Sequence, residues 1–231
     1  MTRLFVTGTD TDVGKTRVTA ALAAACVARG ERPTIVKAVQ TGLAPGIPGD
    51  AAEAGALAGC AALELARFGL AADPWSAALA EAAPPLDAAA LAARIEALAG
   101  PAIVEGAGGA AVPINATETL ADVAVRTSCA AVVVTGLRLG CISHTLLTLE
   151  YLGARGIPVR GVVLVERWRV TAAEERTRVE RAIATRATIL GLIEHDLDAA
   201  RSVARAAALL GPSLAPSTGS GQVLDKVGTR D

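Results

Sequence analysis

A glycine-rich segment near the start of the chain contains the residues best suited to bind a phosphate group. Residues 6 to 16 read V-T-G-T-D-T-D-V-G-K-T, which we interpret as the phosphate-loop pattern G-x-x-x-x-G-K-T with Gly8 as its first glycine. In this pattern the glycines let the backbone approach an anion, and the following helix presents unpaired N–H groups. Lys15 adds a positive charge for the terminal phosphates, and the Thr16 hydroxyl can ligate Mg²⁺. The alternative is a chance glycine turn, but an apolar strand precedes the segment and an alanine-rich helix follows it. We therefore predict a nucleoside-triphosphate site.

A second lysine, Lys37, stands near the end of a predicted buried strand at residues 34–39. A lysine in such an apolar strand is costly unless its ammonium group leaves the strand end or meets an anion. Two lysines around one phosphate would stabilise the negative charge that spreads during phosphoryl transfer. The alternative is a lysine with a buried stem and a hydrated ammonium group. Thr41, in the turn after this strand, could donate a hydroxyl hydrogen bond or only complete the turn.

Two acidic residues could hold a divalent ion beside that phosphate. Glu105 ends a predicted strand at 102–104 and opens a glycine-rich loop, the place where phosphate-loop enzymes put a carboxylate for Mg²⁺. A helix cap or a surface acid is its alternative role. Asp50 precedes a predicted helix at 51–58 and has Glu53 three residues later, which is the capping-box pattern. The pattern alone leaves both capping and metal binding open for Asp50.

The chain alternates between apolar runs typical of buried strands and segments typical of helices. We predict strands at 4–6, 34–39, 102–104, 130–135, 161–165 and 188–193. We predict helices at 18–28, 51–58, 87–98 with Asp87 as N-cap, 119–126, 142–155, 171–185 with Thr171 as N-cap, and 198–210. This alternation predicts an α/β fold, a single-domain P-loop NTPase-like parallel sheet flanked by helices on both faces. Because ligands of such a sheet bind at the carboxyl ends of its strands, the loops described above should meet in one cleft.

The composition bounds the size of the domain and excludes several classes of partner. The 231 residues are 52% hydrophobic, which allows one domain with a large core, and we place that domain at 1–210 with a flexible tail at 211–231. Residues 60–86 are less regular and contain three prolines. With 22 basic and 23 acidic residues and no basic run, nucleic acid is not an expected partner. The four cysteines form no CxxC pair and no apolar run is long enough to span a membrane, so we expect a cytoplasmic protein.

Four motifs together resemble those of the dethiobiotin synthetase family. They are G-T-D-T-D-V-G-K-T at 8–16, V-K-A-V-Q-T-G at 36–42, V-E-G-A-G-G at 104–109 and L-G-C-I-S-H at 139–144. The resemblance covers residues 1 to about 166 and is far more specific than a phosphate loop alone. It implies an ATP-dependent ligase of biotin biosynthesis, with 7,8-diaminononanoate, CO₂ and ATP as substrates. In this reaction a carbamate formed on one amine attacks the γ-phosphate, and the second amine then closes a cyclic urea and releases phosphate.

The resemblance also assigns roles to individual residues. It implies catalytic roles for Lys15, Lys37 and Thr11, and contact of Thr41 with the carbamate or diamine. Thr16, Asp50 and Glu105 match the Mg²⁺ ligands of the family. The residues that the resemblance places at the nucleotide are Asp12, Val13, Gly14, Lys15, Thr16, Arg17, Asp50, Glu105, Gly106, Ala107, Gly108, Val165 and Glu166. The residues that it places at the substrate's carboxylate tail, contributed by the neighbouring subunit of a homodimer, are Gly140, Cys141, Ile142 and Ser143.

The sequence departs from the family where the nucleotide base is bound. Many members have Asn-Asp after the strand at 161–165, and that asparagine contacts adenine, whereas this chain has Val165-Glu166. A later Gly-x-Ile-Pro loop, which also flanks the base in many members, is replaced by Gly191-Leu192-Ile193-Glu194. We therefore expect a looser preference for ATP over other nucleotides.

Other classes of protein and other roles fit the sequence less well. A partitioning-type ATPase switch usually has an extra lysine early in its phosphate loop, and residues 8–13 contain none. A GTPase would carry an Asn-Lys-x-Asp motif, which is absent. His144 and His195 have no second metal ligand at a suitable spacing, so we assign both a structural or surface role.

Overall fold

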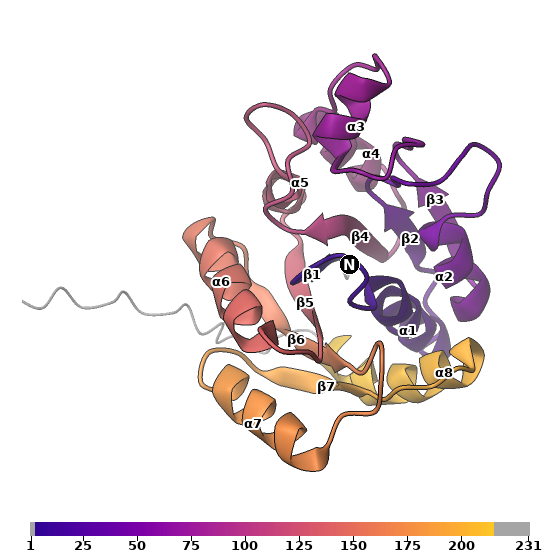
Figure 1. Cartoon of the computed structure of the whole chain (residues 1–231). Helices are drawn as coiled ribbons and strands as arrows, with labels where there is room; N and C mark the ends of the chain where they lie inside the picture. Colours follow the sequence, from indigo (N-terminus) through magenta and orange to yellow (C-terminus); the bar gives the residue numbers. More distant parts are fainter. Residues whose placement is uncertain (1–2, 215–231) are drawn as a thin grey trace, which may run out of the picture.

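The computed structural model describes residues 3–214, and within them seven strands form one parallel sheet (Figure 1). The strands are β1 (Arg3–Gly8), β2 (Thr34–Lys37), β3 (Ala61–Glu64), β4 (Ala102–Gly109), β5 (Ala130–Gly136), β6 (Val159–Val165) and β7 (Ile189–Ile193). Their order across the sheet is β3-β2-β4-β1-β5-β6-β7, and every neighbouring pair is parallel. The sheet therefore grows to one side of β1 and then to the other. This arrangement opens a crevice beyond the carboxyl ends of the central strands.

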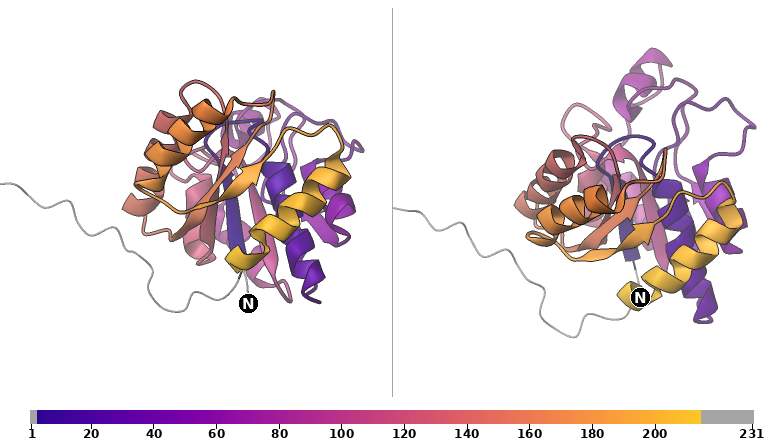
Figure 2. Two further views of the ribbon diagram at one scale, coloured as in Figure 1. Left: turned by 90° about the horizontal axis from the view of Figure 1, so that it is seen from below. Right: turned by 60° about the horizontal axis from the view of Figure 1, so that its bottom comes forward.

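Helices cover both faces of the sheet. The core cluster on one face includes residues of α1 (Lys15–Ala28), α2 (Asp50–Ala58) and α8 (Ala199–Leu210). The cluster on the other face includes residues of α3 (Pro74–Ala80), α4 (Ala88–Glu96), α5 (Leu120–Arg126), α6 (Cys141–Ala154) and α7 (Ala173–Ala184). Both views in Figure 2 show α8 beside α1, although the two helices are far apart in the sequence. The predicted single-domain α/β fold is thus confirmed.

The two core clusters follow from the alternation of side chains along each strand. In β1, Leu4 and Val6 belong to the cluster around α1, whereas Phe5 belongs to the cluster around α5 and α6. Because both faces are covered, the strands are apolar throughout rather than alternating between apolar and polar residues. Helix α1 packs against both α2 and α8, and its alanines at 20, 21 and 23 are fully buried. Small side chains let this helix lie close to α2, α8 and the sheet at once. Because it is covered on several sides, it has no distinct polar face.

Of the three helix caps that the sequence suggested, one is confirmed and two are wrong. Asp87 caps α4 through a side-chain bond to the Ala90 N–H, as predicted. Asp198, which was not predicted as a cap, caps α8 through the Arg201 N–H. Asp50, however, is the first helical residue of α2 and follows an N-cap glycine.

Thr171 does not cap α7 either, because the N-cap is Ala172 and the Thr171 N–H donates to the Glu166 carboxylate instead. The buried Glu166 carboxylate therefore accepts the Thr171 N–H, which in the predicted capping box would be bonded by Glu174.

The segment 60–86 contains two elements that the sequence did not reveal. Strand β3 pairs with β2 at the edge of the sheet, and Asp73 caps α3. The short alanine-rich run of β3 has no strand propensity of its own, so its pairing partner determines its conformation. At the other end of the domain, Gly211–Leu214 form a 3-10 helix with Leu214 buried, and the remainder of the predicted tail lies outside the described residues. In the described part of the chain, no helix combines the length and apolar character needed to cross a membrane.

Candidate active site

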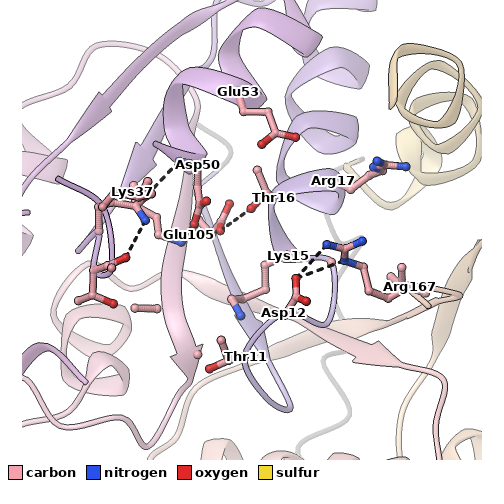
Figure 3. Close-up of a pocket in the computed structure, with 18 of the residues that line it drawn as sticks. Thr11, Asp12, Lys15, Thr16, Arg17, Lys37, Asp50, Glu53, Glu105 and Arg167 are labelled. Atoms are coloured by element: carbon pink, nitrogen blue, oxygen red, sulfur yellow. Dashed lines mark hydrogen bonds and ion pairs between the residues drawn. The ribbon is translucent and has the colours of Figure 1, made fainter. Parts of the chain in front are cut away.

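A cleft of about 840 Å³ lies at the carboxyl ends of the strands and collects residues from six loops (Figure 3). It extends from the loops after β2 and β3, past the phosphate loop, to the loops after β6 and β7. The strand-end rule alone accounts for this convergence, because parallel strands present all their carboxyl ends at one edge of the sheet. The cleft has three parts: the phosphate loop in the middle, a carboxylate-lysine cluster with an apolar extension on one side, and two loops on the other.

The phosphate loop begins α1 without any side-chain cap, so the first N–H groups of the helix are available to an anion. Its N-cap, Gly14, has φ +98°, and a Cβ there would lie 2.9 Å from a Val165 methyl group, so only glycine fits. Five residues separate Gly8 from Gly14, one more than in the four-residue pattern that we assigned, and Asp12 within this loop has φ +58°. The spacing expectation was therefore wrong by one residue, while the strand, loop and helix order is confirmed.

Two arginines from neighbouring strand ends pair with the aspartates of the phosphate loop. Arg167, just after β6, donates to Asp12 Oδ1 at 3.0 Å, as Figure 3 shows. Arg138, just after β5, pairs with Asp10, and its guanidinium lies 5.7 Å from the centroid of the Trp168 ring. Neither arginine was predicted as a site residue, although each follows a predicted strand. Their pairing orients the loop, and the Lys15 ammonium donates to the Asp10 carbonyl at 3.0 Å within it.

A buried cluster of charges adjoins the phosphate loop. Lys37 and Glu105 stand opposite each other in the register of β2 and β4, and the Lys37 Nζ lies 2.8 Å from Glu105 Oε1 and 2.5 Å from Asp50 Oδ2. Thr16 Oγ1 donates to the same Glu105 oxygen at 3.1 Å. The side chains of Lys37 and Glu105 are 4% and 1% exposed, so these charges interact with little screening by water. Figure 3 shows the cluster beside Lys15.

The charges in this cluster alter the pKa of both lysines. Burial alone would lower the pKa of Lys37, but the carboxylates of Glu105 and Asp50 outweigh it and raise the pKa, so Lys37 is an ammonium. Burial, and next the charge of Lys37, lower the pKa of Lys15 to about 8. The site therefore holds a firmly charged lysine and a second lysine whose charge an anionic ligand would stabilise.

The donor atoms of this cluster fit a divalent cation. Glu105 Oε2 is buried without a hydrogen-bond partner, and Thr16, Asp50 and Glu105 supply only oxygen atoms. Hard cations such as Mg²⁺ take oxygen ligands and usually complete their shell with substrate phosphate and water. Within residues 3–214, no group of three or more His, Cys, Asp or Glu side chains forms a metal site on its own. A cation here would consequently depend on the phosphate as well as on the protein.

Asp50 is positioned by groups that the sequence did not reveal. Its backbone N–H donates to Gln40 Oε1 at 3.0 Å, and Gln40 is buried just after β2. The Arg67 guanidinium pairs with both carboxylate oxygens of Glu64 and donates to the Ala44 and Ile47 carbonyls. These bonds hold the loop that leads into α2 and thereby fix the place of the Asp50 carboxylate.

At the opposite end of the cleft, the loops after β6 and β7 are joined by one buried carboxylate. Glu166, 3% exposed, accepts the Thr171 N–H on Oε1 at 2.8 Å and the His195 N–H on Oε2 at 3.1 Å. Asp196 is fixed by Arg201, which donates to both of its carboxylate oxygens, while the Asp196 carbonyl accepts from Arg17 at 2.9 Å. These carboxylates therefore hold loops together. His195, for which the sequence showed no partner, contacts Glu166 and lines the cleft.

The cleft brings together most of the residues singled out in the sequence. Those that line it are Thr11, Asp12, Gly14, Lys15, Thr16, Arg17, Lys37, Thr41, Asp50, Glu105, Ala107, Gly108, Val165 and Glu166. Val13 is buried, and Gly106 contributes its carbonyl, 3.4 Å from the Lys37 Nζ. The segment Gly140–Ser143 begins α6 and does not line this cleft. The Glu53 side chain also lines the cleft rather than completing a capping box.

Comparisons with solved structures identify the fold. The chain is similar to the cell division ATPase MinD of Pyrococcus furiosus, with a TM-score of 0.58, 18% identity, and coverage of 93% of this chain and 98% of that one. It is also similar to a ParA family ATPase of Chlorobium tepidum, with a TM-score of 0.53, 14% identity, and coverage of 92% and 96%. At these identities the likeness shows the shared fold alone.

Comparisons of sequence identify the family. A family model described as an AAA domain matches residues 2–202. The chain is 44% identical to the ATP-dependent dethiobiotin synthetase BioD of Rhodococcus jostii over 169 residues, which cover 71% of this chain and 73% of that protein. It is 39% identical to the protein of the same name from Parafrankia sp. over 229 residues, which cover 97% of this chain and 89% of that protein. The chain therefore belongs to the ATP-dependent dethiobiotin synthetase family.

Proposed function

We propose that this protein is a ligase that converts 7,8-diaminononanoate, CO₂ and ATP into dethiobiotin, ADP and phosphate. The observation that carries this proposal is the placement of the Lys37 ammonium between Asp50 and Glu105, beside the phosphate loop. A partitioning-type ATPase switch usually has its extra lysine within the phosphate loop, whereas the second lysine of this chain stands at the end of β2. A ligase that joins an anionic carbamate to a phosphoryl group needs a second lysine there, because two negative groups must be brought together.

The chain's own residues supply binding and charge stabilisation for this reaction. The N–H groups at the start of α1 and the Lys15 ammonium bind the β- and γ-phosphates. Lys37 holds the carbamate against the γ-phosphate, and Thr11 and Thr41 hydrogen-bond the carbamate or diamine end. The carbamate oxygen attacks phosphorus and ADP leaves, which gives a carbamic–phosphoric anhydride. The second amine then attacks the carbonyl carbon, the C–O bond to phosphate breaks, and a proton leaves the nitrogen as the ring closes.

The apolar extension of the cleft suits the aliphatic chain of the diamine. Beyond Thr41, the cleft wall includes Leu43, Ala71, Pro74 and Val112. Such a wall removes methylene groups from water at about 0.8 kcal/mol for each buried CH₂, while the polar ends remain in the charged part of the cleft. The segment 60–86 thereby gains a role as part of the substrate site.

The proposed cofactor is Mg²⁺, held by Thr16, Asp50 and Glu105 together with the nucleotide. When bound, it would neutralise charge on the β- and γ-phosphates. The proposed nucleotide is ATP, with a base preference looser than the family pattern, because Val165 stands where many relatives have an asparagine that contacts adenine.

The proposed assembly is a homodimer in which Gly140–Ser143 serve the neighbour's cleft. In support, this segment does not line its own cleft, and α6 exposes Leu147, which is 65% accessible, and is preceded by Leu139, which is 98% accessible. Its N-terminal N–H groups could bind a substrate carboxylate. Mixing a Lys37→Gln subunit with a Ser143→Asp subunit should restore turnover that neither homodimer shows, whereas independent monomers would stay inactive. We also propose a cytoplasmic location, which the four free thiols support.

A phosphate-release assay with product mass detection tests the function. We expect phosphate release only when diaminononanoate and bicarbonate are both present, together with one dethiobiotin for each phosphate. ATP hydrolysis that ignores the diamine would support the alternative, a partitioning-type ATPase switch that acts by ATP-dependent dimerisation.

A further inference from the structure

The loop after β7 places a histidine in the cleft whose ring is held by a specific contact. His195 Nδ1 lies 3.3 Å from the Glu166 backbone carbonyl, and the His195 N–H donates to the Glu166 carboxylate at 3.1 Å. One residue, Glu166, therefore fixes both the backbone and the ring of His195. His195 is one of the residues that line the cleft.

The position of His195 along the cleft corresponds to the nucleoside of a bound nucleotide. The phosphates of a nucleotide would lie at the start of α1. The terminal phosphate would face the Lys37 cluster at the ends of β2 and β4, because this cluster has the lysine and the carboxylates that the proposed reaction needs there. A nucleotide with its γ-phosphate there extends in the opposite direction, toward the loops after β6 and β7. Val165 and His195 line this part of the cleft.

The contact with Glu166 determines which hydrogen bond His195 can offer to a base. A backbone carbonyl can only accept, so Nδ1 must carry the proton, and in the neutral ring Nε2 is then an acceptor. Among the described residues, Nε2 has no protein partner. His195 therefore presents one acceptor of fixed orientation.

The other charged side chains at this end are already paired. Arg167 pairs with Asp12, Arg17 donates to the Asp196 carbonyl, and Glu194 pairs with Arg205. Each of these side chains would have to break an existing bond before it could hydrogen-bond a nucleotide base. The Nε2 atom of His195 has no protein partner to lose before it accepts a hydrogen bond from a base.

We propose that His195 is a specificity-determining residue that accepts a hydrogen bond from the exocyclic amino group of the nucleotide base. Adenine and cytosine carry this donor, whereas hypoxanthine and uracil present a carbonyl oxygen at the same position. The loss of the family's adenine contacts would then leave a preference for amino-bearing bases rather than no preference. This inference deepens the proposed function and rests on its nucleotide site, but it does not depend on the identity of the acceptor substrate.

Calorimetric titration with magnesium nucleotides, without diamine or bicarbonate, tests this proposal independently of turnover. We expect the wild-type protein to bind ITP about three- to tenfold more weakly than ATP, and UTP more weakly than CTP by a similar factor, the range expected for one neutral hydrogen bond. His195→Phe keeps a planar ring and should bring both ratios close to one. Glu175→Gln, which removes an ion pair with Arg169 at the start of α7, should leave both ratios unchanged.

Two results would overturn the proposal. Equal affinities within each pair of nucleotides in the wild-type protein would overturn it without any variant. The second is a folded His195→Phe variant, as judged by thermal unfolding, that keeps the wild-type ratios of ATP to ITP and CTP to UTP affinity. That result would show that a group other than His195 distinguishes the bases. If His195→Phe does not fold, His195→Leu serves the same purpose. Should diamine-dependent turnover fail while the ATP to ITP ratio behaves as expected, the proposed function would fall and this inference would stand.

Discussion

The two ends of the cleft use their buried charges in different ways. At the proposed γ-phosphate end, Lys37 bonds to both Asp50 and Glu105 in the cleft itself, and one oxygen of Glu105 has no partner. At the proposed nucleoside end, both oxygens of Glu166 accept backbone N–H groups, and the carboxylate serves to join two loops. One end is arranged to exchange its partners for a ligand, whereas the other is arranged to keep them.

This difference explains where the sequence can depart from its family. Lys15, Lys37 and Glu105 lie in the motifs on which the family resemblance rests, as expected if charge stabilisation requires particular groups at particular places. The nucleoside end needs mainly two loops in fixed positions, and more than one set of residues can provide that. Each prediction below tests one end against the other, beginning with the largest effect.

Lys37→Gln should reduce turnover about a hundred- to a thousandfold, because it removes a donor that stabilises charge in the transition state. Nucleotide affinity should change little, since Lys15 and the start of α1 remain. Product formation by mass detection and calorimetric binding of ATP separate the two effects. Arg29→Gln, which removes only a surface ion pair, is the control. A variant that lost nucleotide affinity but turned over normally once saturated would show that the role of Lys37 is misassigned.

Glu105→Gln should lower the free energy of unfolding by about 3 kcal/mol, because removing one partner of a buried ion pair leaves the other charge poorly compensated. It should also raise the Mg²⁺ concentration needed for tight nucleotide binding. Urea unfolding and Mg²⁺ titrations measure the two effects. The exposed pair of Glu150 with Arg186 offers a comparison, and Glu150→Gln should cost less than about 1 kcal/mol. Equal losses in the free energy of unfolding for the two variants would contradict the claim that the buried ion pairs of Glu105 contribute more to stability than an exposed pair.

Glu166→Gln should lower the free energy of unfolding by about 1 to 3 kcal/mol, since an amide can accept from only one of the two N–H groups and leaves the other unpaired. Nucleotide affinity should weaken, while the turnover rate at saturating nucleotide stays close to that of the wild-type protein. Steady-state kinetics at several ATP concentrations make this separation. A large loss in the saturated rate would mean that the two ends of the cleft are not independent.

Asp196→Asn should have the smallest effect, a small loss of stability above the unfolded pKa of the carboxyl that disappears in acid. Hydrogen bonds from Arg201, and next from the Asp198 N–H, lower the pKa of Asp196 to about 2. A depressed folded pKa stabilises the fold above the unfolded value of 3.8, and this contribution is lost as the pH falls toward about 2. Acid titration followed by tryptophan fluorescence should therefore show less pH dependence between these values in the variant. An identical acid transition would indicate that the loop bond contributes nothing.

The sequence predicted the γ-phosphate end better than the nucleoside end for a physical reason. Lys37 and Glu105 each end an apolar strand, and strand ends converge whatever the details of packing. Gln40, Arg138 and Arg167 also follow strands, but their partners lie in loops distant in sequence, so their pairing becomes visible only in the fold. His195 looked unpartnered because its partner, Glu166, is 29 residues away. The cap prediction for Asp50 failed because the same short polar side chains suit caps and metal sites.

Transfer of isotopic oxygen from bicarbonate to phosphate tests the central claim most directly. If the carbamate attacks the γ-phosphate in this cleft, ¹⁸O-bicarbonate mixed rapidly with enzyme, diamine and ATP should deliver one labelled oxygen to the released phosphate and one to the ring carbonyl. Phosphate that carries oxygen from solvent alone would show that water attacks ATP, and would contradict the claim that Lys37 joins a carbamate to the phosphoryl group.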